Sequence, residues 1–167
     1  NDAPALKSAH IGVAMGKKGT EIAKAAADLI ITNDDLDKLI LSIAAGRRIY
    51  TNLKKAIQYI ISIHIPIILT VALPLFFGWY YPEIFTPVHV IFFELVMGPT
   101  CSIAYESEPM EKNLMHQPPR KMHETFLSQR ELNISIIQGI IITIGVLFVY
   151  QWTALGGANE ETTRAMV

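Results

Sequence analysis

Two long stretches of this sequence lack formally charged side chains altogether, residues 56–78 and residues 132–155. Cysteine is equally scarce, because Cys101 is the single one in 167 residues. That count excludes an internal disulfide, and no cysteine–histidine spacing is typical of a structural zinc site. The net charge of −1 gives no basic surface of the kind that recruits nucleic acid. We therefore expect neither a disulfide framework nor a nucleic-acid partner.

What the sequence has instead is three apolar runs, at residues 56–78, 87–105 and 132–155. At a rise of about 1.5 Å per residue, about 20 residues in a helix cross a hydrocarbon core of about 30 Å. The middle run contains one carboxylate, Glu94. Buried helices of a large soluble protein are the alternative. Three such runs between residues 56 and 155 favour membrane spans, and they make lipid the expected surroundings.

The positions of lysine and arginine predict how these spans are oriented. Basic residues gather before the first run and between the second and third, at Arg47, Arg48, Lys54, Lys55, Lys112, Arg120, Lys121 and Arg130. Residues 79–86 have none and are rich in aromatic residues, which suits a membrane interface. The positive-inside rule then predicts that residues 1–55 and 106–131 are cytosolic and that residues 79–86 and the C-terminus are extracytoplasmic, in a multi-pass protein of the plasma (inner) membrane.

The first third of the chain has the pattern of a soluble α/β domain. Residues 10–16 and 29–32 are short apolar segments that predict strands, and the alanine-rich stretch between them predicts a helix. Residues 33–35, Asn-Asp-Asp, offer N-cap residues for a following helix. Strands that alternate with helices favour part of a parallel sheet. Two short strands do not form a stable sheet alone, so we expect further strands before residue 1 and interpret the chain as a fragment.

A long helix is predicted from Leu36 onward. Apolar residues recur there at helical spacing, and no proline occurs before Pro66. Gly46 alone does not stop a helix. The helix therefore runs from the soluble part directly into the first span.

Four segments in order resemble P-type cation-transporting ATPases. They are the opening NDAPAL within residues 1–32, GRRIYTNLKKAIQYIIS at 46–62, AYESEPMEKNLMHQPPRK at 104–121 and EETTRAMV at 160–167. The resemblance covers essentially the whole chain. It implies the C-terminal part of a HAD-like phosphorylation domain at 1–45, a stalk helix at 46–55, transmembrane helices five and six at 56–105, a cytosolic loop at 106–131, helix seven at 132–155, and an extracytoplasmic loop with the start of helix eight at 156–167.

The same resemblance implies ATP-driven ion transport through a magnesium-bound aspartyl phosphate. Asn1 would donate its side-chain amide to the phosphoryl group, and Asp2 would support the Mg²⁺ site. Without the resemblance, a turn or helix cap is the simpler interpretation of these two residues. The phosphorylated aspartate and the nucleotide-binding domain are not in this sequence, so we expect the chain alone to be inactive.

Glu94 is the strongest candidate for a transport site within the membrane. On a helix it shares one face with Met97, Gly98 and Cys101, and Ser102 flanks that face. Pro99 is expected to break the helix there and to free backbone carbonyls. In the first span, His64 lies two residues before Pro66, where a second break is expected, and Thr70 adds a hydroxyl. His64 and Glu94 are the predicted ligands of the transported cation, with Thr70, Gly98, Cys101 and Ser102 as secondary candidates along the path.

These residues differ from the calcium-pump pattern that the chain resembles. That pattern has a glutamate where this chain has Ile67, and Thr-Asp where it has Met97-Gly98. Two missing carboxylates make a two-calcium site improbable, because Ca²⁺ prefers six to eight oxygen ligands. A single cation or a proton remains as the transported species. A membrane scaffold that descends from such a pump and has a degraded ion site is the alternative function.

Overall fold

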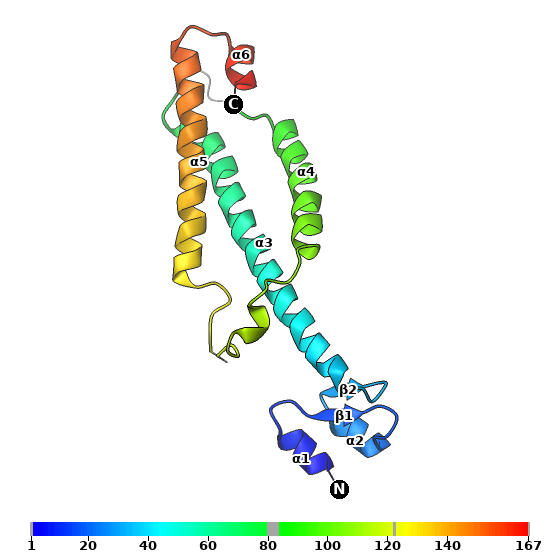
Figure 1. The fold of residues 1–167 in the computed structure, drawn as a ribbon. Coiled ribbons are helices and arrows are strands. Elements are labelled where there is room, and N and C mark those ends of the chain that lie inside the picture. Colours follow the sequence, from blue (N-terminus) through cyan, green and yellow to red (C-terminus); the bar gives the residue numbers. More distant parts are fainter. Residues whose placement is uncertain (1, 80–83, 122, 167) are drawn as a thin grey trace. The chain divides into compact units, whose positions relative to one another are not determined.

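The computed structural model describes residues 2–79, 84–121 and 123–166, without the side chain of Ser102 (Figure 1). The chain forms two compact units. The first comprises Asn1–Arg48 and Met110–Gln117, and the second comprises Ile49–Pro109 and Pro118–Val167. Each unit is described by itself below.

The first unit contains a strand–helix–strand motif, as predicted. Its elements are α1 (Ala3–Ser8), β1 (Val13–Met15), α2 (Glu21–Ala26) and β2 (Leu29–Ile31). The two strands are parallel, with Ala14 opposite Ile30. The Thr20 side chain caps α2 by accepting a hydrogen bond from the Ala23 N–H, over 3.2 Å. Ala14 and Ile31 form the buried core between the elements.

A short piece of the later chain belongs to this first unit. The 3₁₀ helix η1 (Leu114–His116) buries Leu114. Arg47 donates hydrogen bonds of 2.8 Å to the carbonyl oxygens of both Leu114 and Gln117. The guanidinium of Arg47 thus satisfies backbone acceptors at the start of η1 and just after its end, which holds this short helix in place.

Of the N-cap residues predicted at 33–35, Asp35 caps the following helix, and Asp34 closes a loop. Helix α3 begins at Asp37, and Asp35 accepts the hydrogen bond from its N–H, over 3.1 Å. Asp34 takes a left-handed backbone conformation, with φ of 61°. Its carboxylate accepts hydrogen bonds of 2.9 Å from the backbone N–H groups of both Lys17 and Lys18. Asp34 therefore closes the loop that follows β1, because its two oxygens satisfy two neighbouring donors there.

Helix α3 (Asp37–Phe76) is a single element of 40 residues, which confirms the predicted continuation from the soluble part into the first span. The second unit also contains α4 (Pro87–Glu106), α5 (Gln129–Leu155) and α6 (Glu160–Ala165). Among the described residues, α3, α4 and α5 are long and apolar enough to cross a membrane, which confirms the three predicted spans. Of the interface segment predicted at residues 79–86, residues 80–83 lie outside the described part of the chain.

The predicted helix breaks at proline are wrong. Helix α3 continues through Pro66 and Pro74, and α4 continues through Pro99. Each proline removes one N–H donor, and the remaining hydrogen bonds on both sides keep the helix intact, as is common in membrane helices. The missing donors still leave the carbonyls four residues earlier, at Ser62, Thr70 and Leu95, without their usual helical partner.

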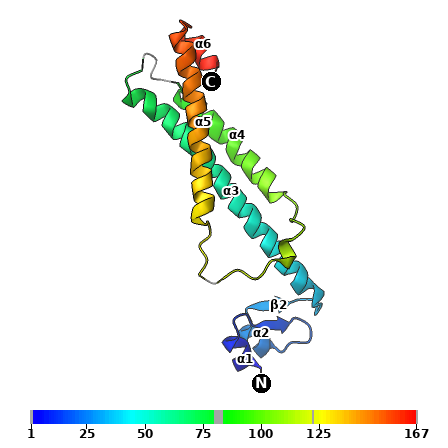
Figure 2. The ribbon, with the colours of Figure 1, turned by 60° about the vertical axis from the view of Figure 1, so that its left-hand side comes forward.

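Helices α3 and α5 both belong to the second unit (Figures 1 and 2), and they approach closely at Gly139. A Cβ atom at Gly139 would lie 2.8 Å from the Cβ of Ile65 and 3.1 Å from the carbonyl oxygen of Ser62. The hydroxyl of Ser62 lies 3.2 Å from both the Ser135 carbonyl and Gln138 Oε1. Because Gly139 has no side chain and the Ser62 hydroxyl bonds to α5, the backbones of α3 and α5 can lie close together.

Helix α4 is joined to α3 beyond the end of its apolar run. Lys55 Nζ lies 2.7 Å from Glu108 Oε1, and the Asn52 side-chain amide donates to the Glu108 carbonyl over 2.9 Å. The rings of Tyr59 and Tyr105 lie 5.7 Å apart. These contacts fix the C-terminal end of α4 against α3, so α4 has a defined register along it.

Asp34→Asn should speed amide hydrogen exchange at Lys17 and Lys18 in the full-length protein at pH 7. The Lys17 N–H, chiefly, holds the pKa of the Asp34 carboxyl below its ordinary value of 3.8. A lowered folded-state pKa means that the stabilisation is present above about pH 4 and is lost as the pH falls through the folded value. The difference from the unaltered protein should therefore vanish in acid. Asp35→Asn is the matched control, and equal exchange in both variants would contradict the role of Asp34.

Gly139→Ala should lower the free energy of unfolding of the full-length protein in detergent by about 1–3 kcal/mol. The added methyl group is too large for the contact between α3 and α5. Gly145→Ala is the control on the same helix. A Cβ there would meet nothing within 4 Å among the described residues. Equal losses for both variants would show that the effect comes from glycine content and not from the contact.

Candidate functional site

The structure brings together the two ionisable residues that the sequence places inside the membrane. His64 Nε2 of α3 lies 3.1 Å from Glu94 Oε1 of α4. The side chains are 43% and 50% exposed. Neither side chain is buried among the described residues, so both can accept further contacts. An imidazole and a carboxylate in contact from two apolar helices form a polar site in surroundings where such groups are costly.

The other ring nitrogen of His64 has a fixed partner as well. Nδ1 lies 2.8 Å from the carbonyl oxygen of Ile60, one turn earlier on α3. A carbonyl can only accept, so this contact is a hydrogen bond when Nδ1 carries the proton. That tautomer directs the lone pair of Nε2 toward Glu94. One further proton, on either His64 or Glu94, then completes the hydrogen bond between them.

The structure describes the surroundings of three of the secondary candidates, Thr70, Gly98 and Cys101. Thr70 is 1% exposed and donates over 2.7 Å to the Pro66 carbonyl within its own helix. Cys101 is buried, and a Cβ added at Gly98 would meet nothing within 4 Å among the described residues. Ser102 lies in α4, and its side chain is outside the described part. Across the described residues, no three His, Cys, Asp or Glu side chains come together as a metal-binding group.

The two residues predicted for the phosphorylation site lie at the very start of the chain. Asn1 is outside the described residues. Asp2 is exposed at the beginning of α1, where its carbonyl oxygen accepts a hydrogen bond of 2.9 Å from the Leu6 N–H. Its carboxylate makes no capping hydrogen bond. The helix-cap interpretation therefore fits the backbone of Asp2 and leaves its side chain available.

A polar cavity of about 430 Å³ lies between α3, α4 and α5, and the sequence analysis did not foresee it. It contains the Lys55–Glu108 ion pair at one end. Ser62 lines it two residues before His64. Its lining residues are Lys55, Gln58, Tyr59, Ser62, Tyr105, Glu108 and Gln138. The glutamines in otherwise apolar runs were the available signal, because an amide within the membrane needs a polar partner.

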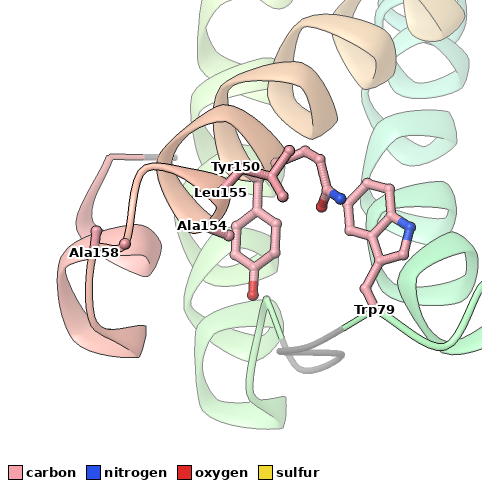
Figure 3. Close-up of a pocket in the computed structure, with 7 residues that line it drawn as sticks. Trp79, Tyr150, Ala154, Leu155 and Ala158 are labelled. Atoms are coloured by element: carbon pink, nitrogen blue, oxygen red, sulfur yellow. The ribbon is translucent and has the colours of Figure 1, made fainter.

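A second cavity, of about 380 Å³, lies at the opposite end of α5 (Figure 3). Trp79 stacks on Tyr150, with ring centroids 6.1 Å apart and planes inclined by 11°. The other lining residues are Gln151, Ala154, Leu155, Gly157 and Ala158. Among the described residues that line this cavity there is no acid or base, and their composition is typical of an aromatic contact at a membrane interface.

Comparison with known proteins decides the family. The family model described as "Cation transporting ATPase, C-terminus" matches residues 82–167. The chain belongs to the cation-transporting ATPases. Calcium-transporting ATPase 1 of Lactococcus lactis is 35% identical over 98% of this chain and 19% of its own length. Calcium-transporting ATPase 4, endoplasmic reticulum-type, of Arabidopsis thaliana is 35% identical over 90% of the chain and 14% of its own length. Human calcium-transporting ATPase type 2C member 1 is 32% identical over 93% of the chain and 16% of its own length.

The resemblance to a calcium-pump-like P-type ATPase is therefore confirmed. The chain spans about a fifth of the length of the curated relatives that it matches, since it covers 19% of the Lactococcus protein. In this cation-transporting ATPase, the His64–Glu94 pair is the intramembrane feature that joins two of the long apolar helices through ionisable side chains.

A double-mutant cycle on the full-length protein should show that the two residues are coupled. His64→Ala and Glu94→Ala should each lower thermal stability. The double variant should lose less than the sum, by about 0.5 kcal/mol or more, since each single change leaves the other group unpaired in the membrane. Thr100→Ala with His64→Ala is the control cycle, because Thr100 donates to Val96 within its own helix. Strict additivity for His64 and Glu94 would contradict the contact.

Proposed function

We propose that this chain is the C-terminal part of an ATP-driven cation pump and that His64 and Glu94 bind the ion that is transported. The observation that carries the proposal is the 3.1 Å contact between the two side chains, on two helices that are apolar enough to span a membrane. Ionisable groups at that depth are costly and are typical of ion pathways. The named relatives are calcium-transporting ATPases, which supports a cation as the substrate.

Backbone oxygens that lack a helical donor are further candidates for the ligand set that we propose. Pro66 and Pro99 leave the carbonyls of Ser62 and Leu95 without their usual helical donors. Carbonyl oxygens of this kind are good ligands for cations inside membrane proteins. The polar cavity that ends at Ser62 supports access for a hydrated ion from that side of the membrane. Thr70, Gly98, Cys101 and Ser102 stay secondary candidates along the path.

The chemistry that drives transport lies in the soluble part of the proposed pump. We propose that residues 1–45 end a HAD-like phosphorylation domain, and the parallel strand–helix–strand motif of the first unit supports this. ATP would supply the phosphoryl group and Mg²⁺ its counter-charge. Asn1 would donate to phosphoryl oxygens, and Asp2 would support the Mg²⁺ site, to which its exposed carboxylate is suited. The chain alone, without the phosphorylated aspartate, would not hydrolyse ATP.

The proposed pump lies in the plasma (inner) membrane, with residues 1–55 and 106–131 on the cytosolic side. The excess of lysine and arginine in these segments supports the orientation. In the same scheme, residues 46–55 are the stalk, residues 56–105 form helices five and six, and residues 132–155 form helix seven. Residues 156–167 then contain an extracytoplasmic loop and the start of helix eight.

A second candidate function is a membrane scaffold that has lost transport. The specific observation in its favour is Met97-Gly98, which stands where the calcium-pump pattern has a threonine and an aspartate. The contact between His64 and Glu94 favours the pump, because a scaffold has no need of two ionisable groups that meet between apolar helices.

The test is cation-stimulated ATPase activity of the full-length pump in vesicles, for the unaltered protein and for Glu94→Gln. Removing the charge of Glu94 should raise the cation concentration for half-maximal stimulation at least tenfold, because the ligand loses its charge. Formation of the aspartyl phosphate from inorganic phosphate should persist, since that reaction depends on the soluble catalytic site.

Thr100→Val is the control on the same helix and should leave stimulation unchanged, because the Thr100 hydroxyl donates to Val96 of its own helix over 2.6 Å. A normal cation response in Glu94→Gln would remove Glu94 from the transport site. Absence of any cation or pH response in the unaltered pump would favour the scaffold.

A further inference from the structure

We propose that the His64–Glu94 site selects a divalent first-row transition-metal ion, of which Zn²⁺ and Co²⁺ are the test cases, over Ca²⁺. This inference rests on the proposed function, since it names the class of ion that the same site takes. It goes beyond that function, because the relatives named above are calcium-transporting proteins.

The first step is the nitrogen donor. A histidine that binds a metal commonly donates its other ring N–H to a backbone carbonyl or a carboxylate, which fixes the tautomer and aims the ligand nitrogen. His64 has this arrangement, with Nδ1 lying 2.8 Å from the Ile60 carbonyl. The lone pair of Nε2 then points at Glu94. The imidazole is therefore already oriented as a metal ligand by its own helix.

The second step is the separation of the two donor atoms. Zinc lies about 2.0–2.1 Å from a histidine nitrogen and about 2.0–2.2 Å from a carboxylate oxygen. Two such ligands, at a ligand–metal–ligand angle between a right angle and the tetrahedral value, are about 3.0–3.4 Å apart. The observed distance from Nε2 to Oε1 is 3.1 Å. One ion can thus replace the shared proton with little movement of α3 against α4.

The third step is what the site offers to calcium. Ca²⁺ takes six to eight oxygen ligands and is poorly matched by an imidazole nitrogen. Across residues 56–78, 87–105 and 132–155, Glu94 is the single acidic residue. The side-chain donors that meet in the site are therefore one carboxylate oxygen and one imidazole nitrogen. Imidazole with carboxylate favours ions such as Zn²⁺ and Co²⁺.

The experiment measures ATPase stimulation of the full-length pump in proteoliposomes against buffered free Zn²⁺, Co²⁺, Ca²⁺ and K⁺. Zn²⁺ or Co²⁺ should reach half-maximal stimulation at a free concentration at least tenfold below that for Ca²⁺. His64→Asn replaces the nitrogen donor with an amide oxygen of similar reach. It should reduce the preference for the transition metal over Ca²⁺ at least tenfold and leave phosphorylation from inorganic phosphate intact.

His89→Asn is the matched control. His89 lies in the first turn of α4, where Nδ1 is 2.9 Å from the Thr86 hydroxyl, and its replacement should leave the ion preference unchanged. A direct readout is X-ray absorption at the zinc edge of the loaded pump. The multiple scattering typical of an imidazole ligand should be present in the unaltered pump and in His89→Asn, and absent in His64→Asn.

The outcomes separate this inference from the proposed function. Stimulation by Ca²⁺ at lower concentration than Zn²⁺ and Co²⁺, with Glu94→Gln abolishing it, overturns the inference and keeps the cation pump. Stimulation by acid or by K⁺ alone does the same in favour of a proton or a monovalent ion. Unchanged preference and unchanged X-ray scattering in His64→Asn overturn the nitrogen ligand. Indifference of the pump to both His64→Asn and Glu94→Gln overturns the site itself.

Discussion

The hydrogen bond between His64 and the Ile60 carbonyl is the constraint on which the chemistry of the membrane part depends. It joins two residues one turn apart on α3, so it needs no other element to form. Because the carbonyl accepts a hydrogen bond from Nδ1–H, Nε2 is left to face Glu94 on α4. A histidine without that bond could turn either nitrogen to its neighbour. Local helix geometry therefore decides which atom of the imidazole reaches the space between the two helices.

Polar groups in these helices are satisfied in two ways, and the difference separates structure from function. The hydroxyls of Thr70, Thr100 and Thr143 each donate to a carbonyl of their own helix, over 2.6–2.8 Å. Such bonds use the hydroxyl proton within the helix and leave only the lone pairs of the oxygen for a ligand. His64 and Glu94 instead meet across helices, with their side chains 43% and 50% exposed. A half-exposed pair of this kind leaves donor atoms accessible to an ion.

Helix α4 is held against α3 at successive levels, and this gives the pair its register. Glu94 contacts His64, Tyr105 contacts Tyr59, and Glu108 beyond the helix end contacts Lys55. A slide or rotation of α4 that separated Tyr105 from Tyr59, or Glu108 from Lys55, would also change the distance from His64 Nε2 to Glu94 Oε1. The site is thus tied mechanically to the polar residues that line the cavity beside it.

The sequence by itself determined the three spans, the strand–helix–strand motif, the long helix from the soluble part and the choice of His64 and Glu94, because apolar periodicity and a charge in an apolar run are local signals. It misjudged Pro66 and Pro99, since one missing donor does not end a helix whose other bonds persist. It gave no sign of the contacts of Asp34, because their partners lie 16 and 17 residues away. The tertiary structure alone decided that His64 contacts Glu94 and that α3 packs closely against Gly139. It also decided that Gln58 and Gln138 line one cavity. Contacts between helices depend on their rotation and depth of approach, which no single segment encodes.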